Sequence, residues 1–593
     1  LKMLVVYLLT LLIYSCHGAV IFPQEDNTHL TTCVHDIILH WCKNGSHITY
    51  VDINYGDNNV IKEVHSMDFI TVISRTTEIN IDHENEAYLV MIENFVTFKN
   101  EFILLTKEIN WKPNAYYIIV FKEFEQTILT ELFQSLLRLH IFNVAVLHAS
   151  KDSSIYTYNP FQNNNCGKMF EEIIQFDNCS ETVIPNIYFN KTEKILKGCT
   201  FNAAIPVWPP FTTNPKNDGI VKLNGIEQFV MQILGELEGF YLNYTYTDNP
   251  EDFSVVENMT ATGTLGLIQE GKIDITFGGL FLLHKRALAF SYLYGYHDND
   301  DEILVLVKKA EPVPIWKNIY LEFTYLVWIL LLLVFVMYFL VLSILFPLKD
   351  KCVLILVMWD LLFLHSRKLR LKFKGKCILF QWVIFAFFIN TFYQSSLTGF
   401  TTHPINNYQI SNKEDLSNFK IQPCVSSVMK KYIKVTENKY INDSNKDCDG
   451  LLDSVRVVSK DYTKYTVVLR FIYKFHESKY KNEFGISLLY QFPRPESKVI
   501  HAIYCYKGFP LLGKMHIYAL RLRENGLIDK RIRDLKHEVS KATIKAKKDF
   551  KASFIFPWQI LIIGYGLSTV VFVIELIVDY IKRRRMQVII YLE

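Results

Sequence analysis

Three long apolar runs dominate the hydrophobic and polar pattern of the chain. Residues 323–346, 377–402 and 552–574 contain no Asp, Glu, Lys or Arg. An α-helix rises about 1.5 Å per residue, so roughly 20 apolar residues cross the hydrocarbon core of a bilayer. Each run therefore predicts a transmembrane helix. A fourth run, Cys352 to Leu364, is too short to cross and contains Asp360.

The charged flanks of these runs predict their orientation. Basic residues gather at 349–351, 367–376 and 582–585, and such clusters favour the cytoplasmic side of a membrane. The short run then enters and leaves from the inside, as a re-entrant loop does where protein or a watery pore surrounds it. The lysines of residues 541–551 would lie outside and oppose this orientation. We retain it because Arg583–Arg585 abut the membrane and the sequon at Asn442 requires the preceding region outside.

Outside the membrane, short apolar strands alternate with amphipathic helices. Tyr116–Phe121 predicts a strand, residues 126–139 space Leu and Phe as a helix does, and Asn143–Leu147 predicts a second strand. This βαβ order predicts α/β extracellular lobes before residue 317 and over residues 404–551.

Composition and the first residues of the chain predict a secreted and inserted protein. The chain has 593 residues, of which 50% are hydrophobic, and its Lys+Arg total of 63 nearly balances an Asp+Glu total of 60. This balance gives no reason to expect a nucleic-acid partner. Lys2, the apolar residues 3–13 and the small residues Cys16 and Gly18 are typical of a signal peptide, with the mature chain beginning near Ala19.

A secretory route permits glycosylation and disulfides. The Asn-x-Ser/Thr sequons begin at Asn44, Asn178, Asn190, Asn243, Asn258 and Asn442. The cysteines expected outside are Cys33, Cys42, Cys166, Cys179, Cys199, Cys424, Cys448 and Cys505, an even set whose connectivity does not follow from sequence. Near His29, His35 and His40 the spacing matches no closed zinc pattern, and the oxidising compartment favours a Cys33–Cys42 disulfide. No metal and no cofactor are expected.

Beyond residue 198, short segments stand in a specific order around the first two apolar runs. Residues 198–211, 225–237 and 271–279 precede them, and residues 404–405, 414–416, 464–465 and 522–530 follow. This order looks like the split ligand domain of ionotropic glutamate receptors, which a pore interrupts. Tyr393–Phe400, with Thr402 and Pro404 after it, resembles the gate of the divergent insect branch. By resemblance over residues 198–579, the chain is identified as a divergent arthropod ionotropic receptor.

The resemblance implies a fold class and domain boundaries. The fold would be a split clamshell like that of periplasmic binding proteins, with three spans and one re-entrant loop. The boundaries are a signal peptide at 1–18, a reduced amino-terminal region at 19–197, half-domains of the ligand-binding lobe at 198–317 and 404–551, spans at 318–349, 377–403 and 552–581, a re-entrant pore loop at 350–366 and a cytoplasmic tail at 582–593.

The resemblance also implies ligand-binding residues. In glutamate receptors an arginine after a strand of the first half-domain holds the ligand carboxylate through parallel N–H donors, and Arg286 is the matching residue. Arg470 stands where the family has an acid for the ammonium of an amino acid, and a cation there would repel that group. The ligand is thus expected to be a carboxylic acid. The alternatives are that the arginines are solvated and that Trp208 and Phe211 line an apolar cleft.

Further positions follow from the same match. Ser426 and Ser427 replace the turn that offers backbone donors to the ligand at a helix start. The gate falls at Ser395, Ser396, Leu397, Gly399 and Phe400, where small side chains let helices approach closely. In the pore loop the matching residues are Trp359, His365, Ser366 and Arg367.

The function implied is that of a subunit of a ligand-gated cation channel acting as a chemosensory receptor. Members of this family are expected to form heterotetramers with co-receptor subunits in the plasma membrane of sensory-neuron dendrites, and to bind small molecules. A non-conducting surface binding receptor is the main alternative. A transporter is disfavoured because the sequence shows no inverted repeat. The sequence holds no His-Glu-x-x-His, Gly-x-Ser-x-Gly or Cys-x-x-Cys pattern, so no enzyme is expected.

Overall fold

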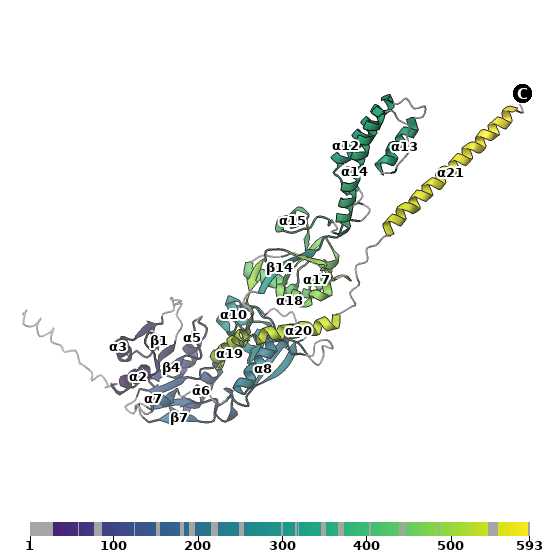
Figure 1. Ribbon diagram of the computed structural model, residues 1–593. Helices are drawn as coiled ribbons and strands as arrows, with labels where there is room; N and C mark the ends of the chain where they lie inside the picture. The colour runs from purple at the N-terminus through teal and green to yellow at the C-terminus, as the bar shows by residue number, and fades with distance from the viewer. Residues whose placement is uncertain are drawn as a thin grey trace, which may run out of the picture.

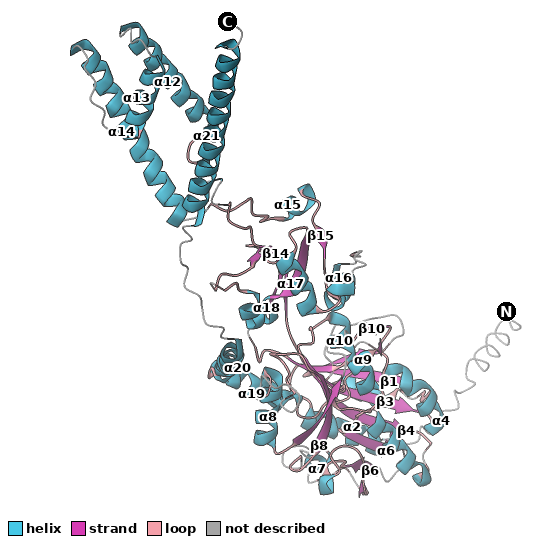
Figure 2. Ribbon diagram, turned by 90° about the vertical axis from the view of Figure 1, so that its right-hand side faces the viewer, coloured by secondary structure: helices cyan, strands magenta, loops and turns pink. Residues whose placement is uncertain are grey.

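The computed structural model describes residues 28–590 except 57, 76–85, 109, 124, 150–153, 178, 180–182, 189–195, 215–222, 248–253, 298–300, 315–316, 318–319, 346–350, 364, 366–372, 403–404, 438–440, 442–445, 484 and 544–554. Three regions follow one another along the molecule: an amino-terminal unit, a pair of α/β lobes and a group of long helices (Figure 1). The strands lie in the first two regions (Figure 2). The predicted signal peptide lies outside the described residues.

The amino-terminal unit is built on a 7-stranded sheet of order β2-β1-β3-β4-β5-β6-β7. Neighbouring strands from β2 to β5 run parallel, whereas β6 is antiparallel to β5 and β7. Its strands are β1 (Ser46–Ile53), β2 (Ile70–Ser74), β3 (Ala87–Ile92), β4 (Tyr116–Phe121), β5 (Val144–His148), β6 (Ile155–Tyr158) and β7 (Ile173–Phe176). Its helices include α2 (Thr28–Trp41), α3 (Asn59–His65), α4 (Phe95–Thr97), α5 (Ile103–Leu105), α6 (Leu129–Arg138) and α7 (Ile184–Ile187).

The predicted βαβ order is confirmed in this unit. The sequence β4, α6, β5 matches the predicted strand, helix and strand, and β4 pairs parallel with β5. Every residue of β3 is buried, because a central strand of a parallel sheet is covered on both faces.

The first lobe is built on a 5-stranded sheet of order β13-β19-β12-β8-β9. Its strands are β8 (Thr200–Pro206), β9 (Tyr241–Thr247), β12 (Ile275–Thr276), β13 (Ser291–Leu293) and β19 (Ile503–Cys505), with a small hairpin of β10 (Val256–Glu257) and β11 (Thr260–Ala261). Its helices are α8 (Ile226–Glu238), α9 (Gly263–Gln269), α10 (His284–Ala289), α19 (Leu512–Glu524) and α20 (Leu527–Thr543).

The second lobe has its own 5-stranded sheet, in which β14 pairs with β16, β17 and β18 and β15 pairs with β16. Its strands are β14 (Asp301–Lys308), β15 (Gln422–Pro423), β16 (Lys464–Leu469), β17 (Leu489–Gln491) and β18 (Ser497–Val499). Its helices are α15 (Lys413–Asn418), α16 (Ser427–Glu437), α17 (Leu451–Lys460) and α18 (Arg470–His476).

The two lobes exchange segments across the membrane part of the sequence. β14 precedes the first predicted span yet pairs antiparallel with β16, from Ile303 opposite Leu469 to Val307 opposite Tyr465. β19 follows the second span yet pairs with β12 and β13. Residues 198–317 and 404–551 therefore each contribute to both lobes, so the predicted half-domains are chain segments rather than lobes.

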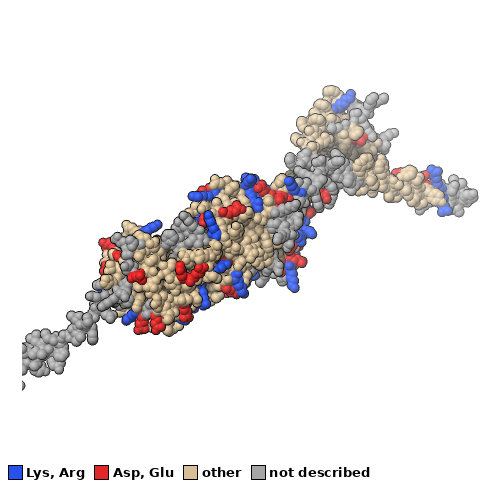
Figure 3. Space-filling model, turned by 90° about the horizontal axis from the view of Figure 1, so that it is seen from below, with Lys and Arg blue, Asp and Glu red and all other residues tan. Residues whose placement is uncertain are grey.

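The long helices contain the candidate membrane spans. Three helices of the described residues are long and apolar enough to cross a bilayer, and they lie in α12 (Tyr325–Leu345), α14 (Phe373–Thr402) and α21 (Ile555–Ile590). The third candidate span starts at Leu561 and reaches Arg584, later than the predicted run, because α21 continues past residue 574 without a break. These helices look mostly uncharged beside the lobes, whose surface carries charges of both signs (Figure 3).

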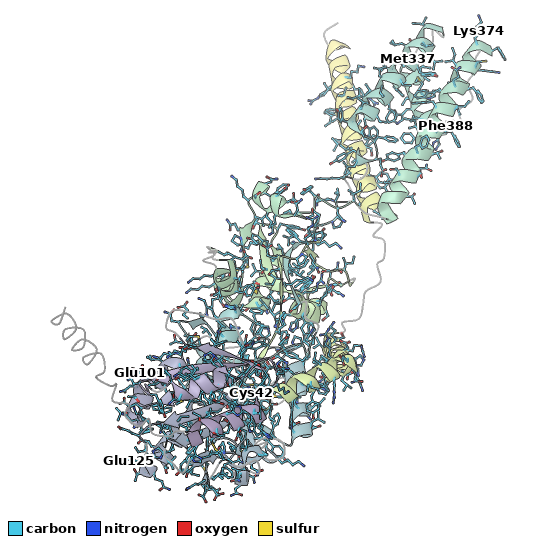
Figure 4. The ribbon with its side chains drawn as sticks, turned by 90° about the vertical axis from the view of Figure 1, so that its left-hand side faces the viewer. Cys42, Glu101, Glu125, Met337, Lys374 and Phe388 are labelled. Carbon is cyan, nitrogen blue, oxygen red and sulfur yellow. A yellow bond between two sulfur atoms is a disulfide. The ribbon has the colours of Figure 1, made fainter. Side chains whose placement is uncertain are left out.

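A short helix, α13 (Lys351–Leu362), packs between the first two candidate spans. The indole of Trp382 in α14 is buried and donates to the carbonyl of Met358 at 3.2 Å. Lys374 lies at the end of α14 remote from the lobes (Figure 4), and its cytoplasmic location stays a prediction. The re-entrant path of this segment stays a prediction.

The disulfides correct one expectation. Cys33 pairs with Cys179 and not with Cys42, because α2 carries the Cys33 side chain inward against the core that also holds Cys179, with the two Cα atoms 5.4 Å apart. Cys166 pairs with Cys199 and Cys424 with Cys448. Cys42 and Cys505 are free thiols.

Candidate functional site

The two lobes meet through aromatic side chains of the first lobe that enter the core of the second. Phe211, in the loop after β8, is fully buried, and its ring centroid lies 5.4 Å from that of Phe471 in α18. Phe281 meets Tyr432 of α16 edge to face at 4.9 Å. Burying a phenylalanine contributes about 1.5–3 kcal/mol, so these contacts hold the lobes together in this conformation.

Two glycines allow this close approach. Gly278 and Gly279 have φ values of 141° and 71°, a region that favours glycine. A Cβ atom on Gly278 would lie 2.4 Å from Pro206, and one on Gly279 would lie 2.6 Å from the Phe211 ring. The glycine pair in the sequence thus serves backbone shape and packing at the lobe interface.

A buried carboxylate holds the same loop. The amides of Gly278 and Gly279 donate to Oε2 of Glu227 in α8 at 2.6 and 3.0 Å, and the Tyr296 hydroxyl donates to Oε1. Burial raises the pKa of Glu227, and these hydrogen bonds offset part of that rise. The glycine amides are therefore satisfied by a side chain of the same lobe.

An ion pair connects this loop to the second lobe. His501 Nε2 lies 3.0 Å from Asp301 Oδ2, and His501 Nδ1 lies 3.1 Å from the Gly279 carbonyl. Asp301 Oδ1 accepts the amide of Phe471 at 3.1 Å. A carbonyl and a carboxylate both accept hydrogen bonds, so both contacts are hydrogen bonds only when both ring nitrogens carry a proton, and the contact with Asp301 is then an ion pair. Both side chains are buried, at 3% and 2% exposure.

Beside this contact the lobes enclose a groove of about 510 Å³, lined by residues 254–257 and 283–286 of the first lobe and 434–436 of α16. Lys285, Arg286 and Lys434 line it, with Glu257 as its acid. A groove rich in cations at the lobe interface favours an anionic ligand.

Arg286, the predicted carboxylate fork, forms part of the wall of this groove and is 1% exposed. Its Nε and Nη2 donate to the Ser254 carbonyl at 3.1 and 2.6 Å, and its Nη1 donates to the Phe281 carbonyl at 2.9 Å. The alternative of a solvated arginine is therefore wrong for this residue. These N–H groups already donate to backbone carbonyls, so a ligand carboxylate would have to displace those carbonyls. Binding of a ligand carboxylate by Arg286 therefore stays a prediction.

The other predicted ligand residues lie apart from Arg286. Ser426 is buried and its hydroxyl caps the start of α16 by accepting the Met429 amide at 3.4 Å. Ser427 begins that helix, whereas the groove touches its last turn, roughly 12 Å further along the helix axis. Arg470 begins α18 and pairs with Glu302 at 2.8 Å. The structure does not gather these residues around one groove.

Hydrogen bonds join the two chain segments that lead to the membrane helices. The Val313 amide donates to the Ile405 carbonyl at 2.7 Å, and the Asn407 amide donates to the Glu311 carbonyl at 3.0 Å. The Ala310 amide donates to the Gln409 side chain at 2.7 Å. Residues 310–313 lead to α12 and residues 405–409 follow α14, so we call this pairing the linker ribbon. It couples the second lobe to two membrane helices at once.

The predicted gate lies in the last turns of α14, on the side of the lobes. Ser395 and Gly399 are exposed, Ser396 and Leu397 are partly buried, and a Cβ atom on Gly399 would meet nothing within 4 Å. The Phe400 side chain lies outside the described residues. Among the described residues there is therefore open space for a Cβ atom at position 399.

The predicted pore-loop residues fall at the end of α13. Trp359 is 52% exposed and its ring lies 6.1 Å from that of Phe335 in α12. His365 is exposed, and its amide donates to the Asp360 carbonyl at 2.9 Å. Ser366 and Arg367 lie outside the described residues.

Three predicted sequons fall on described asparagines. Asn44, Asn243 and Asn258 are exposed on the amino-terminal unit and the first lobe. Asn178, Asn190 and Asn442 lie outside the described residues.

Sequence patterns missed the residues that join the lobes. Asp301 and His501 stand 200 positions apart, and no local spacing connects them. Glu227 lies within residues 225–237, and its local sequence does not indicate that the side chain is buried. The burial of Glu227 next to Gly278 and Gly279 becomes visible only in the folded structure.

Two α/β lobes joined to three helices of membrane-spanning length define a membrane receptor. Residues 42–194 match the family described as "Putative ionotropic receptor, ligand binding domain". This match supports an ionotropic receptor related to the glutamate receptors. The matched residues lie in the amino-terminal unit rather than in the two lobes. The family's ligand-binding description therefore falls on the region predicted to be a reduced amino-terminal region. Comparison with curated proteins finds no match.

Proposed function

We propose that the chain is a subunit of a ligand-gated cation channel that acts as a chemosensory receptor of the arthropod type, and that it is not an enzyme. The linker ribbon carries this proposal, because it joins the second lobe to α12 and α14 through backbone hydrogen bonds. A movement of that lobe is thereby transmitted to the helix that ends in Ser395–Phe400. The first lobe leads through α20 to α21.

In this mechanism the ligand binds at the interface between the two lobes and closes them like a clamshell. A small carboxylic acid enters the groove between residues 283–286 and the end of α16, where Lys285 and Lys434 attract its charge. Binding there changes the angle between the lobes about the Asp301–His501 pair. The ligand shifts the gate only by its differential affinity for the two states, and moving a 1:99 population to 99:1 takes about 5.5 kcal/mol.

Assembly with other subunits completes the pore. The candidate span of α21 is 0% buried within the chain, so its apolar surface is left for lipid or for neighbouring subunits. We propose a heterotetramer with co-receptor subunits in the plasma membrane of sensory dendrites. The short α13 would line the inner mouth of the pore as a re-entrant loop.

Dose-response curves in cells that express the chain alone and with a co-receptor subunit test this function. Arg286→Ala should raise the half-maximal concentration of a carboxylic acid about ten- to a hundredfold, since a charge-assisted contact contributes about 1.5–3 kcal/mol. Arg456→Ala is the matched control, because Arg456 pairs with Asp453 on the exposed face of α17.

Two results would contradict the proposal. Unchanged potency in Arg286→Ala would remove the anion site from the lobes. Ligand binding without current in any subunit combination would leave a non-conducting surface receptor.

A further inference from the structure

The border between the amino-terminal unit and the first lobe is held by several kinds of contact. The Cys166–Cys199 disulfide crosses it, the His140 ring stacks on Tyr506 at 4.1 Å, and Lys168 pairs with Asp274 at 3.5 Å. A covalent link with a stacked pair beside it fixes the two regions relative to each other. Cavities along this border are therefore parts of one rigid surface.

One of these cavities is a groove of about 460 Å³, which we call the border groove. It is lined by residues 110–114 of the amino-terminal unit and by residues of the first lobe between 287 and 294 and between 507 and 516. Its lining residues, all of them described, include Lys112 and Lys507 and no Asp or Glu. The side chains that line the groove therefore carry positive charge.

Lys507 is the unusual group of this groove. Its ammonium is buried, and among the described residues it has no hydrogen-bond partner. It lies 5.6 Å from the centroid of the Trp111 ring. A cation–π contact offsets only part of the cost of burying a charge, and a buried ammonium normally has a hydrogen-bonded partner. Burial lowers the pKa of Lys507 to about 8, so the group is still mostly protonated at neutral pH.

Aromatic rings form the other walls of the border groove. Trp111 is 8% exposed, Tyr294 is 42% exposed, and the Tyr294 ring meets His516 edge to face at 5.4 Å. The Tyr292 and Tyr294 rings lie 5.9 Å apart. Such walls suit a flat apolar body, while a flexible lysine stem lets the ammonium turn toward a charge that enters the groove.

We propose that the border groove is a binding site for a small organic anion, a carboxylate with an aromatic body, which Lys507 holds by its charge. This site goes beyond the proposed ligand groove between the lobes and shares no residue with it. The anion would contact the amino-terminal unit through Trp111 and the first lobe through Tyr294. It would thus stabilise the border and modulate the receptor from outside the clamshell.

The site also gives a role to the segment that matches the receptor family. Residues 110–114 lie inside the matched residues 42–194, so the border groove is the place where that segment and the first lobe share a wall. A ligand held there would act on both.

Equilibrium binding of radiolabelled benzoate to the full chain, purified in detergent, tests the proposal. Lys507→Met should weaken benzoate binding about tenfold or more, since a charge-assisted contact is lost. Lys514→Met is the matched control, because Lys514 pairs with Glu238 away from the groove, and it should bind benzoate like the wild type. Benzamide, the neutral analogue, should compete about tenfold less well than benzoate.

Several outcomes would overturn the border site. Benzoate that does not bind, that binds Lys507→Met as tightly as wild type, or that is matched by benzamide would remove the anion from Lys507. Loss of binding in Arg286→Ala but not in Lys507→Met would move the site to the lobes. If Lys507→Met does not fold, Tyr294→Ala replaces it, and unchanged benzoate affinity in that variant contradicts the proposal. No current is measured, so failure here leaves the proposed channel function standing.

Discussion

Replacing Asp301 with asparagine removes the charge that pairs with His501 at the lobe interface. Asp301→Asn keeps an oxygen for the amides of Glu302 and Phe471, which donate to Oδ1 at 2.9 and 3.1 Å. It leaves a protonated His501 ring buried without a counter-charge. Breaking a buried ion pair by removing one partner costs about 3–5 kcal/mol. Because the backbone hydrogen bonds survive, we expect the lower end, about 3 kcal/mol.

Thermal unfolding of the full chain measures this cost. For a domain of 150–250 residues, 1 kcal/mol shifts the Tm by about 2–4 °C, so Asp301→Asn should lower the Tm of the lobes by about 6–12 °C. Asp453→Asn is the control, because Asp453 pairs with Arg456 while both side chains are more than half exposed, and exposed pairs contribute about 0–1 kcal/mol. In the double variant Asp301→Asn with His501→Gln, the two losses should not add, because the partners lose the same contact.

Equal Tm values for Asp301→Asn and Asp453→Asn would refute the ion pair as a link between the lobes. Additive losses in the double variant would show that the two residues act separately.

Three further outcomes are expected. Gln409→Ala, which removes the acceptor of the Ala310 amide in the linker ribbon, should reduce the maximal evoked current without changing surface delivery, whereas the exposed Gln175→Ala should leave the current unchanged. Peptide mapping without reduction should recover the Cys33–Cys179 link, with Cys42 alkylated slowly because burial raises its pKa to about 11; a Cys33–Cys42 peptide would contradict the structure. In ligand-free protein, Lys507→Met should be more stable than wild type at pH 7. This difference in stability should shrink between about pH 8 and the ordinary lysine pKa of 10.5, because Lys507 loses its proton in the folded state before it does so in the unfolded state. A pH-independent difference would contradict the burial of the ammonium.

Local patterns predicted the elements well, and they failed where distant segments meet. Tyr116–Phe121 and Asn143–Leu147 are strands because short apolar runs of that kind bury in a sheet, and the long charge-free runs are helices for the same reason in a membrane. The exchange of β14 and β19 between the lobes joins segments more than 150 residues apart, and periodicity contains no information on such pairing.

The candidate site shows the same limit. Arg286 was identified by its place after the glycine pair, yet whether its guanidinium faces a ligand or a carbonyl depends on where residue 254 folds back. The Cys33–Cys179 pair spans 146 positions, and an even number of cysteines does not give its connectivity. Trp208 and Phe211 were named as an alternative lining of the cleft, and Phe211 does lie buried between the lobes.

The most direct measurement of a ligand-gated pore in this chain is the accessibility of a cysteine at Ser396 during gating. The Ser396→Cys receptor, expressed with a co-receptor subunit, should give a current evoked by a carboxylic acid, and a charged thiol reagent should reduce that current when applied with the acid and much less when applied alone. The wild-type receptor controls for its own free cysteines. If the reagent has no effect on cysteines introduced at positions 395, 396 or 399, in cells where the acid evokes a current, then α14 of this chain does not line the pore.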